Sequence, residues 1–162
     1  MQVVPVIFPQ TSASNTLIAG DRVSLSKASE VCFLVNIGTV TSGYSGSITV
    51  IACTAATSGS SSVLGTLRYR KMTTVDTWGA ETSDTDILID AAGEIVPADP
   101  VNALIEIRVL ASDLRAISQT TDYEWVYVNI GAGGGSKYIT CAAEAILFPL
   151  RYGPDIPVTV IA

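Results

Sequence analysis

Few residues in this chain could do chemistry, because the sequence contains no histidine. A hydrolase of the Ser-His-Asp or Cys-His kind needs an imidazole base beside its nucleophile, and many zinc sites need imidazole ligands. The sequence excludes both kinds of site. A pair of carboxylates is the remaining route to a catalytic centre, since glycoside hydrolysis needs no histidine.

The carboxylates do not fit that route. Glu106, Glu124 and Glu144 lie in or beside stretches of alternating hydrophobicity, so we interpret them as outward-facing strand positions. Four further acids lie close together but lack the Asp-x-Asp-x-Asp-Gly order and terminal Glu of a calcium loop. These four are Glu81, Asp84, Asp86 and Asp90. We expect no metal site, no cofactor and no enzymatic activity.

Two other motifs suggest binding sites. Residues 131–137, Gly-Ala-Gly-Gly-Gly-Ser-Lys, resemble a phosphate loop, but Ser136 precedes Lys137 and a strand-like stretch follows, so we predict a hairpin connection. Aromatic residues could form a sugar-stacking surface, although packing in the core or at an interface is the commoner use of such side chains. These residues are Tyr44, Trp78, Trp125 and Tyr127.

The composition favours an assembly over a free-standing domain. The chain has 162 residues, 48% of them hydrophobic and 15% charged, with a mean hydropathy of +0.44. Ordinary soluble domains carry roughly 25% charged residues. A domain this apolar is expected to bury part of its surface against neighbours. The alternative is a well-buried sandwich with a Ser/Thr-rich surface.

Charge and hydropathy also limit the partners. The formal net charge is −6 and no basic cluster occurs, which argues against nucleic-acid binding. No apolar run is long enough for a membrane helix, and the N-terminus lacks the pattern of a secretion signal. The three cysteines, Cys32, Cys53 and Cys141, lie in apolar runs without CxxC spacing. This is typical of free, buried thiols in a reducing compartment, with one disulfide pair as the alternative.

The central elements of the fold are expected within residues 104–130. Residues 104–110 and 125–130 alternate in hydrophobicity, which indicates strands of an antiparallel sheet. Between them, Ser112 or Asp113 can cap one short helical turn, which would carry the chain from one sheet to another. Asp122-Tyr123 suggests a tyrosine corner, with an ordinary edge tyrosine as the alternative.

Other strands are predicted at regular intervals along the chain. Residues 28–37 are apolar on both faces and are placed centrally, and residues 63–72 are predicted to form one strand. Eight or nine strands separated by Gly/Ser/Thr turns indicate an all-β, antiparallel β-sandwich, either Ig-like or jelly-roll.

The two ends of the sequence are apolar and able to form strands. We therefore predict an N-terminal arm at 1–15, a sandwich domain at 16–153 and a C-terminal arm at 154–162. Such arms lie across a neighbour or add a strand to its sheet, unless each folds back on its own domain. The predicted partner contacts are Val4, Val6, Phe8, Ile156, Val158 and Val160.

The order of several short motifs resembles a group of small virion structural proteins of tailed bacteriophages. The motifs are Leu-Arg-Tyr-Arg-Lys-Met to Asp-Thr-Trp-Gly at 67–79, Ala-Ser-Asp-Leu at 111–114 with Asp-Tyr-Glu-Trp-Val-Tyr-Val at 122–128, and Arg-Tyr at 151–152. The resemblance covers roughly residues 28–152. It implies a capsid decoration or cement protein, bound to the major capsid protein on the outer head shell, commonly as a homo-oligomeric trimer.

We therefore expect a non-enzymatic viral structural protein, located on the capsid surface of the virion and made in the host cytoplasm. It would stabilise the head shell through subunit–subunit contacts, with no nucleic-acid or membrane partner. A shell-building subunit is a further option. The alternative from another class is a carbohydrate- or receptor-binding module of a phage tail or fibre, with Trp78 and Tyr44 on its loops.

Overall fold

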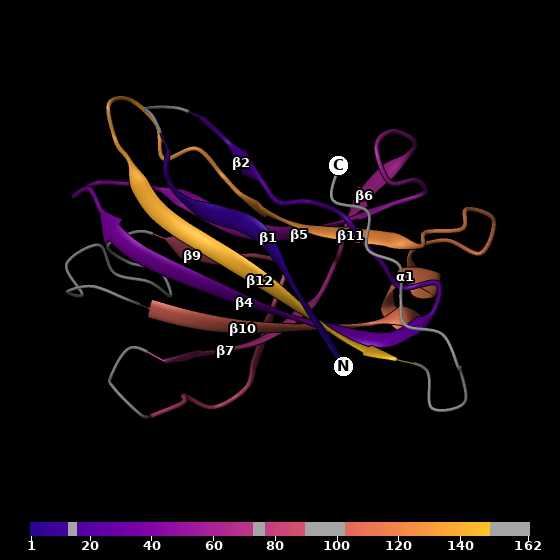
Figure 1. The fold of residues 1–162 in the computed structure, drawn as a ribbon. Coiled ribbons are helices and arrows are strands. Elements are labelled where there is room, and N and C mark those ends of the chain that lie inside the picture. Colours follow the sequence, from indigo (N-terminus) through magenta and orange to yellow (C-terminus); the bar gives the residue numbers. More distant parts are fainter. Residues whose placement is uncertain (13–15, 73–76, 90–102, 150–162) are drawn as a thin grey trace.

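The computed structural model describes residues 1–12, 16–72, 77–89 and 103–149, and in these ranges two antiparallel sheets pack into a sandwich (Figure 1). The first sheet has the strand order β1-β12-β4-β10-β7-β8. Its bounds are β1 Gln2–Thr11, β12 Ile139–Pro149, β4 Ala28–Val40, β10 Ala103–Leu110, β7 Leu67–Met72 and β8 Thr82–Asp84. The predicted antiparallel β-sandwich is confirmed.

The second sheet is smaller and lies behind the first. Its order is β2-β11-β5-β6, while β3 also pairs with β11 and β9 with β5. The bounds are β2 Ile18–Ala19, β11 Trp125–Ile130, β5 Gly46–Cys53, β6 Ser61–Val63, β3 Val23–Ser24 and β9 Ile87–Ile89. Of the described residues, only Ala111–Ile117 form a helix, α1, and no described helix is long and apolar enough to cross a membrane.

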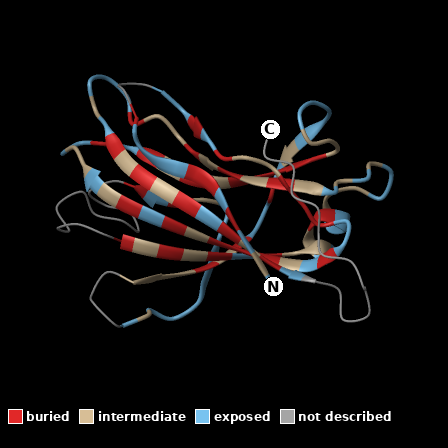
Figure 2. Ribbon diagram, viewed as in Figure 1, coloured by how far each residue is buried: buried red, intermediate tan, exposed pale blue. Residues whose placement is uncertain are grey.

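The core lies between the two sheets and follows the period of two. Val31, Phe33 and Val35 of β4 are fully buried, as are Val126 and Val128 of β11. Between these buried residues of β4, Leu34 is partly exposed, whereas Cys32 is buried. The buried and exposed bands therefore alternate along the long strands in Figure 2. The predicted central place of β4 is confirmed, because β12 and β10 flank it.

The predicted crossover is also confirmed. β10 belongs to the first sheet, α1 follows it directly, and β11 belongs to the second sheet. Asp113 holds the start of α1, because its Oδ2 accepts a hydrogen bond of 2.8 Å from the Leu110 N–H. The same oxygen lies 2.5 Å from Nη2 of Arg68 on β7. One carboxylate thus ties the helix to the neighbouring strand.

Replacing Asp113 with alanine should lower the free energy of unfolding by about 1–2 kcal/mol, because the cap and the ion pair are lost together. Urea denaturation measures the change. Ser112→Ala is the matched control, since Ser112 is exposed on the same turn and should shift stability by no more than about 0.5 kcal/mol. Equal urea midpoints for the two variants would contradict the assigned role of Asp113.

The N-terminal segment follows the alternative in which the arm folds back on its own domain as an edge strand. β1 pairs antiparallel with β12 along the edge of the first sheet, and the Val6 carbonyl accepts a 2.8 Å hydrogen bond from the Asp21 N–H. Val4 and Val6 are only 5% and 3% exposed, so this pairing withdraws them from any neighbour. The physical reason is that the segment can cover the edge of β12 without the entropy loss of association.

Proline and a bulge explain how β1 fits this edge. Pro5 and Pro9 are tolerated because an edge strand has one side without ladder partners. The register shifts between Pro5 and Ile7, so Val6 and Ile7 are both buried although they are consecutive. Phe8 remains 60% exposed, and it is the one predicted N-terminal contact that a neighbour could reach. Ile156, Val158 and Val160 lie outside the described residues.

The strand predicted at residues 63–72 is corrected to two strands. β6 ends at Val63 in the second sheet, and β7 begins at Leu67 in the first. Gly65 lies between them on the surface, where glycine interrupts a strand at little steric cost. The period of two is broken there, since the buried residues Leu64 and Leu67 are three positions apart, and Gly65 marks the break.

Candidate subunit interface

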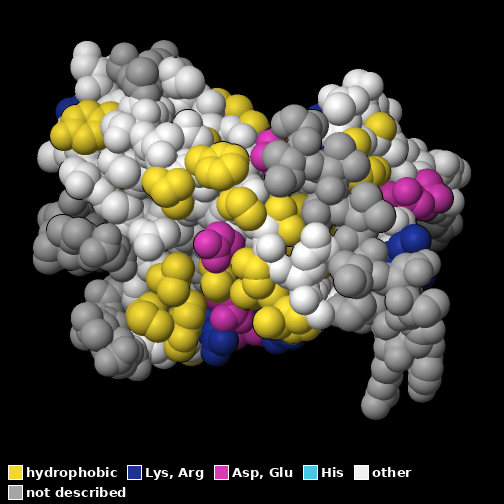
Figure 3. Space-filling view, viewed as in Figure 1, with side chains coloured by type: hydrophobic (Ala, Val, Ile, Leu, Met, Phe, Trp, Pro, Cys, Tyr) yellow, Lys and Arg dark blue, Asp and Glu magenta, His cyan; other side chains and the backbone are white. Residues whose placement is uncertain are grey.

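The outward surface of the first sheet is the most extensive candidate for a binding site. We call it the open face and define it by the outward side chains of β12, β4, β10 and β7. In Figure 1 β1 crosses these strands near the N-terminus and leaves their middle uncovered by described elements, and Figure 3 shows hydrophobic side chains gathered over the middle of the surface. The strands present these side chains because their alternate residues fill the core.

Pairing between the strands places the apolar residues together. Ala142 of β12 lies opposite Asn36 of β4, which lies opposite Leu104 of β10, and Met72 of β7 completes that row. In the next row Leu34 lies beside Glu144. Leu34, Leu104 and Met72 are each partly exposed.

These residues surround a shallow hollow of about 230 Å³, lined by Leu34, Asn36, Leu104, Ala142, Ala143 and Glu144. Apolar side chains around a depression on a sheet surface are typical of the central part of a protein interface.

Charged residues on the same face are paired within the chain. Arg70 Nη2 lies 2.6 Å from Glu106 Oε2, and Arg108 Nε lies 2.6 Å from Glu30 Oε1. The hydrogen bond with Glu30, together with its negative charge, raises the pKa of Arg108. Arg70 also lies over the Trp78 ring, 4.7 Å from its centroid. Paired charges cost less to cover with a partner than isolated ones.

Glu144 is the exception. It is exposed on β12 between Pro5 of β1 and Leu34 of β4, which lie opposite it in the two neighbouring strands. Among the described residues its carboxylate has no cationic partner. The open face thus combines an apolar hollow with one unpaired negative charge at its rim.

The edge of the first sheet extends this apolar surface. Val3 and Phe8 of β1 are 51% and 60% exposed, and Phe148 near the end of β12 is 38% exposed. Val3 lies opposite Ile146, which is itself only partly buried. Large apolar side chains that gather on one side of a domain mark a contact surface more often than scattered ones do.

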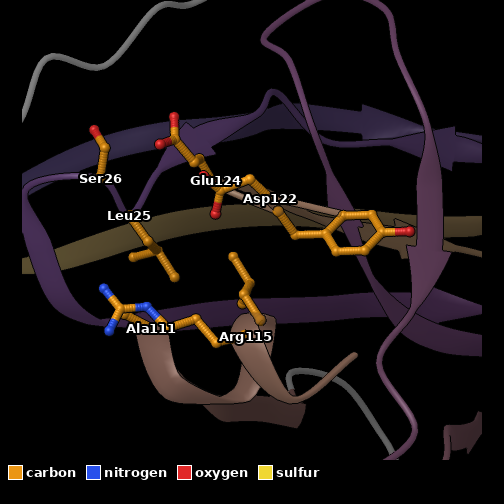
Figure 4. A pocket seen from close by; sticks show the side chains of 8 residues that line it. Leu25, Ser26, Ala111, Arg115, Asp122 and Glu124 are labelled. Carbon is orange, nitrogen blue, oxygen red and sulfur yellow. The ribbon is translucent and has the colours of Figure 1, made fainter. Parts of the chain in front are cut away.

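A second hollow lies beside α1 and is less suited to binding. It measures about 150 Å³, and its buried lining consists of Leu25 and Leu114. Figure 4 shows Leu25 facing the helix, while Asp122 and Glu124 lie on the side away from it. These two carboxylates and Arg115 of α1 are all exposed to solvent. Charged groups that are spread around a small opening in this way do not converge on a ligand.

The four aromatic residues predicted as a sugar-stacking surface do not form one cluster, although Trp125 and Tyr127 share the outward face of β11. Tyr44 is 1% exposed, so it cannot stack on a ligand, and its hydroxyl donates a hydrogen bond to the Gly131 carbonyl. Trp78 packs on Arg70 beside the first sheet. Trp125 and Tyr127 lie on β11 in the second sheet, where the Arg22 guanidinium lies 5.4 Å from the Tyr127 ring centroid. The loop site proposed for the carbohydrate-binding alternative therefore loses Tyr44.

The remaining sequence motifs have structural roles. Residues 131–138 connect β11 to β12 without a helix, and Gly134 and Gly135 have φ angles of 71° and 56°, as expected for a turn. Asp84 Oδ1 accepts a 2.7 Å hydrogen bond from the Thr85 N–H in the turn after β8, and Asp90 lies outside the described residues. Within the described ranges, no group of His, Cys, Asp and Glu is arranged to hold a metal ion.

The predicted state of the cysteines is confirmed. Cys32, Cys53 and Cys141 are all free and buried. Burial raises the pKa of Cys141 to about 11, and burial together with Glu106 and Glu30 raises that of Cys32 to about 11. The raised pKa values keep these thiols protonated at neutral pH, which makes them weak nucleophiles.

Comparisons with known proteins give little further information. No protein-family model and no curated protein matches the chain. A chain in the structure of infectious bursal disease virus Gt strain aligns with a TM-score of 0.26 and 9% identity, over 93% of this chain and 42% of that one. For the Gx strain these values are 0.27, 8%, 92% and 42%. This chain therefore spans less than half the length of either, and alignments this loose establish neither a shared fold nor a shared function.

Proposed function

We propose that this protein is a non-enzymatic structural protein of a virion, bound as a homo-oligomer to the outer surface of the capsid as a decoration or cement protein. The observation that carries the proposal is the open face, an apolar and hollowed sheet surface on a weakly charged domain. The order of motifs shared with small phage virion proteins supports the same role. The buried thiols fit synthesis in the reducing cytoplasm of a host.

Contact area would supply the stabilisation. Burial of apolar surface contributes roughly 25 cal/mol per Å², so about 300 Å² at one joint contributes several kcal/mol before ordering costs are subtracted. A shell repeats the same joint many times. Small contributions at each joint therefore add up to a particle that resists expansion and heat.

The test is the location of the protein in purified particles made from the genome that encodes it. We expect quantitative mass spectrometry to find it at a copy number comparable to that of the shell subunit, and antibodies to label the outer surface of the head. Particles from a genome lacking this reading frame should assemble but release their nucleic acid at a lower temperature. Absence of the protein from purified particles, or labelling confined to the tail, would contradict the proposal.

A further inference from the structure

We propose that the open face is the contact surface of a two-fold symmetric dimer, in which Glu144 and the hollow of each copy receive Arg70 and Met72 of the other. This inference deepens the proposed function, because it names the contact between neighbouring subunits, and it rests on that function for the expectation of a homo-oligomer. Three observations carry it: the extent of the open face, the rows that its side chains form, and the geometry of Arg70.

The open face is large enough for a stable dimer. Strands β1, β12, β4, β10 and β7 lie side by side, and a spacing of about 4.8 Å gives them a combined width of about 24 Å. The eight residues of β10 extend over about 27 Å. The flat area of about 650 Å² is close to the roughly 800 Å² that each partner buries in a typical complex. A second copy offers a surface of the same size and twist.

Strand pairing arranges the outward side chains in rows that cross the open face from β12 to β7. The first row is Glu144, Leu34, Glu106 and Arg70, and the second is Ala142, Asn36, Leu104 and Met72. Within one copy, three strand spacings of about 4.8 Å separate Glu144 from Arg70. Arg70 pairs with Glu106 instead, and Glu144 has no cationic partner within the described ranges.

A two-fold axis that runs along the strands keeps each row and reverses its order. When the axis lies between β4 and β10, at the centre of both rows, β12 of one copy faces β7 of the other. Glu144 then faces Arg70, and this contact occurs twice in the dimer. In the next row Ala142 faces Met72. Sheets packed face to face lie about 10 Å apart, a gap that an arginine and a glutamate side chain fill together.

Other positions of the two-fold axis do not neutralise Glu144. An axis along β12 places it against Glu144 of the other copy, one along β4 against Glu106, and one between these strands against Leu34. An axis across the strands stacks β12 on itself, and β12 contains no basic residue. Like charges in contact are unfavourable, and a buried charge without a partner is costly. Charge complementarity therefore selects the axis between β4 and β10.

The Arg70 guanidinium is held in place and can still bind a second carboxylate. Its Nε and Nη2 donate to Glu106 Oε2 over 3.0 and 2.6 Å, and the centroid of the Trp78 ring lies 4.7 Å from its Cζ. Nη1 has no acceptor in the part of the chain that the structure describes, and the Arg70 side chain is 41% exposed. Since a guanidinium has five N–H donors, Arg70 can bind Glu144 of a second copy without leaving Glu106.

Met72 supplies the apolar part of the contact. It lies two residues from Arg70 on the same side of β7, just as Ala142 lies two residues from Glu144 on β12. The symmetry operation that joins Arg70 to Glu144 therefore also brings Met72 over the hollow of about 230 Å³. Methionine is flexible and fills irregular apolar gaps. One placement of the second copy thus satisfies both the charge and the hollow.

Sedimentation equilibrium of the full-length chain tests this contact. We expect the wild-type protein to have twice the chain mass of 16.9 kDa. Glu144→Arg and Arg70→Glu each place like charges at both contacts, so each should weaken dimerisation by about 100-fold. An equimolar mixture of the two variants should dimerise about as tightly as the wild type, because the heterodimer has opposite charges at both contacts.

Arg70→Glu also loses the ion pair with Glu106, so Met72→Asp tests the same contact independently. It puts a charge into the hollow of the partner and should weaken dimerisation by about 100-fold. Val63→Asp is the matched control, because Val63 is 54% exposed on the second sheet and should leave dimerisation unchanged. Circular dichroism and urea midpoints show whether each variant is folded.

A monomeric or trimeric wild-type protein, or a mixture that dimerises no better than the single variants, would overturn the inference. The proposed function fails separately. A monomer found on the heads of purified particles would keep that function while the dimer contact is lost. A dimer with the expected response to the variants, but absent from particles, would keep the contact while the function is lost.

Discussion

Replacing Gly133 with alanine is expected to lower the free energy of unfolding by about 3 kcal/mol, although the residue lies in a glycine-rich connection. A Cβ at this position would overlap the Tyr44 ring at Cδ2. The ring cannot move away, because a Cβ position on Gly46 would lie 2.6 Å from its Cε1 atom on another side. Its hydroxyl is also held by the Gly131 carbonyl. Gly133 and Gly46 thus let the backbone close around one buried phenol.

Urea denaturation with two further variants tests this arrangement. Gly65→Ala is the control, since a Cβ there meets nothing within 4 Å and should change stability by less than about 0.5 kcal/mol. Tyr44→Ala removes the ring and should cost roughly 3–5 kcal/mol. In the Tyr44→Ala background, Gly133→Ala should then become nearly neutral, because the clash is gone. A full additional loss in the double variant would rule out the ring as the reason for the glycine.

Raising the pH from 8 to 10.5 is expected to destabilise the protein by about 4 kcal/mol. The pKa values of Cys32 and Cys141 are raised from 9.0 to about 11 in the folded state, so the unfolded chain releases these protons first. Stability is therefore full below pH 9 and is lost as the pH rises towards 11. Each thiol contributes about 2 kcal/mol of the loss at pH 10.5. Tyr44, whose pKa burial raises from 10.0 to about 12, extends the loss above pH 10.

Urea midpoints between pH 8 and 10.5 measure this dependence, with reduced protein throughout. Cys141→Ala is expected to be less stable at pH 8, because a buried side chain is shortened, but to lose about 2 kcal/mol less between the two pH values. Ser112→Ala, on the exposed side of α1, should keep the wild-type slope. A midpoint that stays constant up to pH 10.5 would show that the thiols do not control the alkaline transition.

Much of the fold is predictable because it depends on local pattern. Alternation at residues 104–110 and 125–130 indicates two half-buried strands, and the polar Ser-Asp pair between them indicates the helical crossover that α1 makes. The doubly apolar stretch that forms β4 indicates a central strand. The lack of histidine excludes whole classes of catalytic site by residue type alone, since no fold can supply a side chain that the chain does not contain.

Other features depend on which distant segments meet. Whether residues 2–11 cover a neighbour or their own sheet cannot be read from their hydrophobicity, and pairing with β12 decides it and buries Val4 and Val6. Tyr44 is predicted as a loop residue available to a ligand, yet its phenol bonds to Gly131, which lies 87 residues further along the chain. A tyrosine corner, which the sequence suggests at Tyr123, would instead join the phenol to backbone a few residues upstream.

For the open face, too, the sequence determines some features and the tertiary structure decides others. Sequence alone determined that Glu144 and Leu104 occupy outward strand positions, because the period of two is a property of each strand. Leu34 lies in a stretch that is apolar on both faces, so its outward position is known only from the structure. Only the strand order placed them side by side, since β4, β10 and β12 are far apart in the chain and become neighbours through antiparallel pairing. Burial and strand pairing depend on the whole folded chain. Only the tertiary structure could therefore show that the Glu144 carboxylate, which has no cationic partner among the described residues, lies beside an apolar hollow.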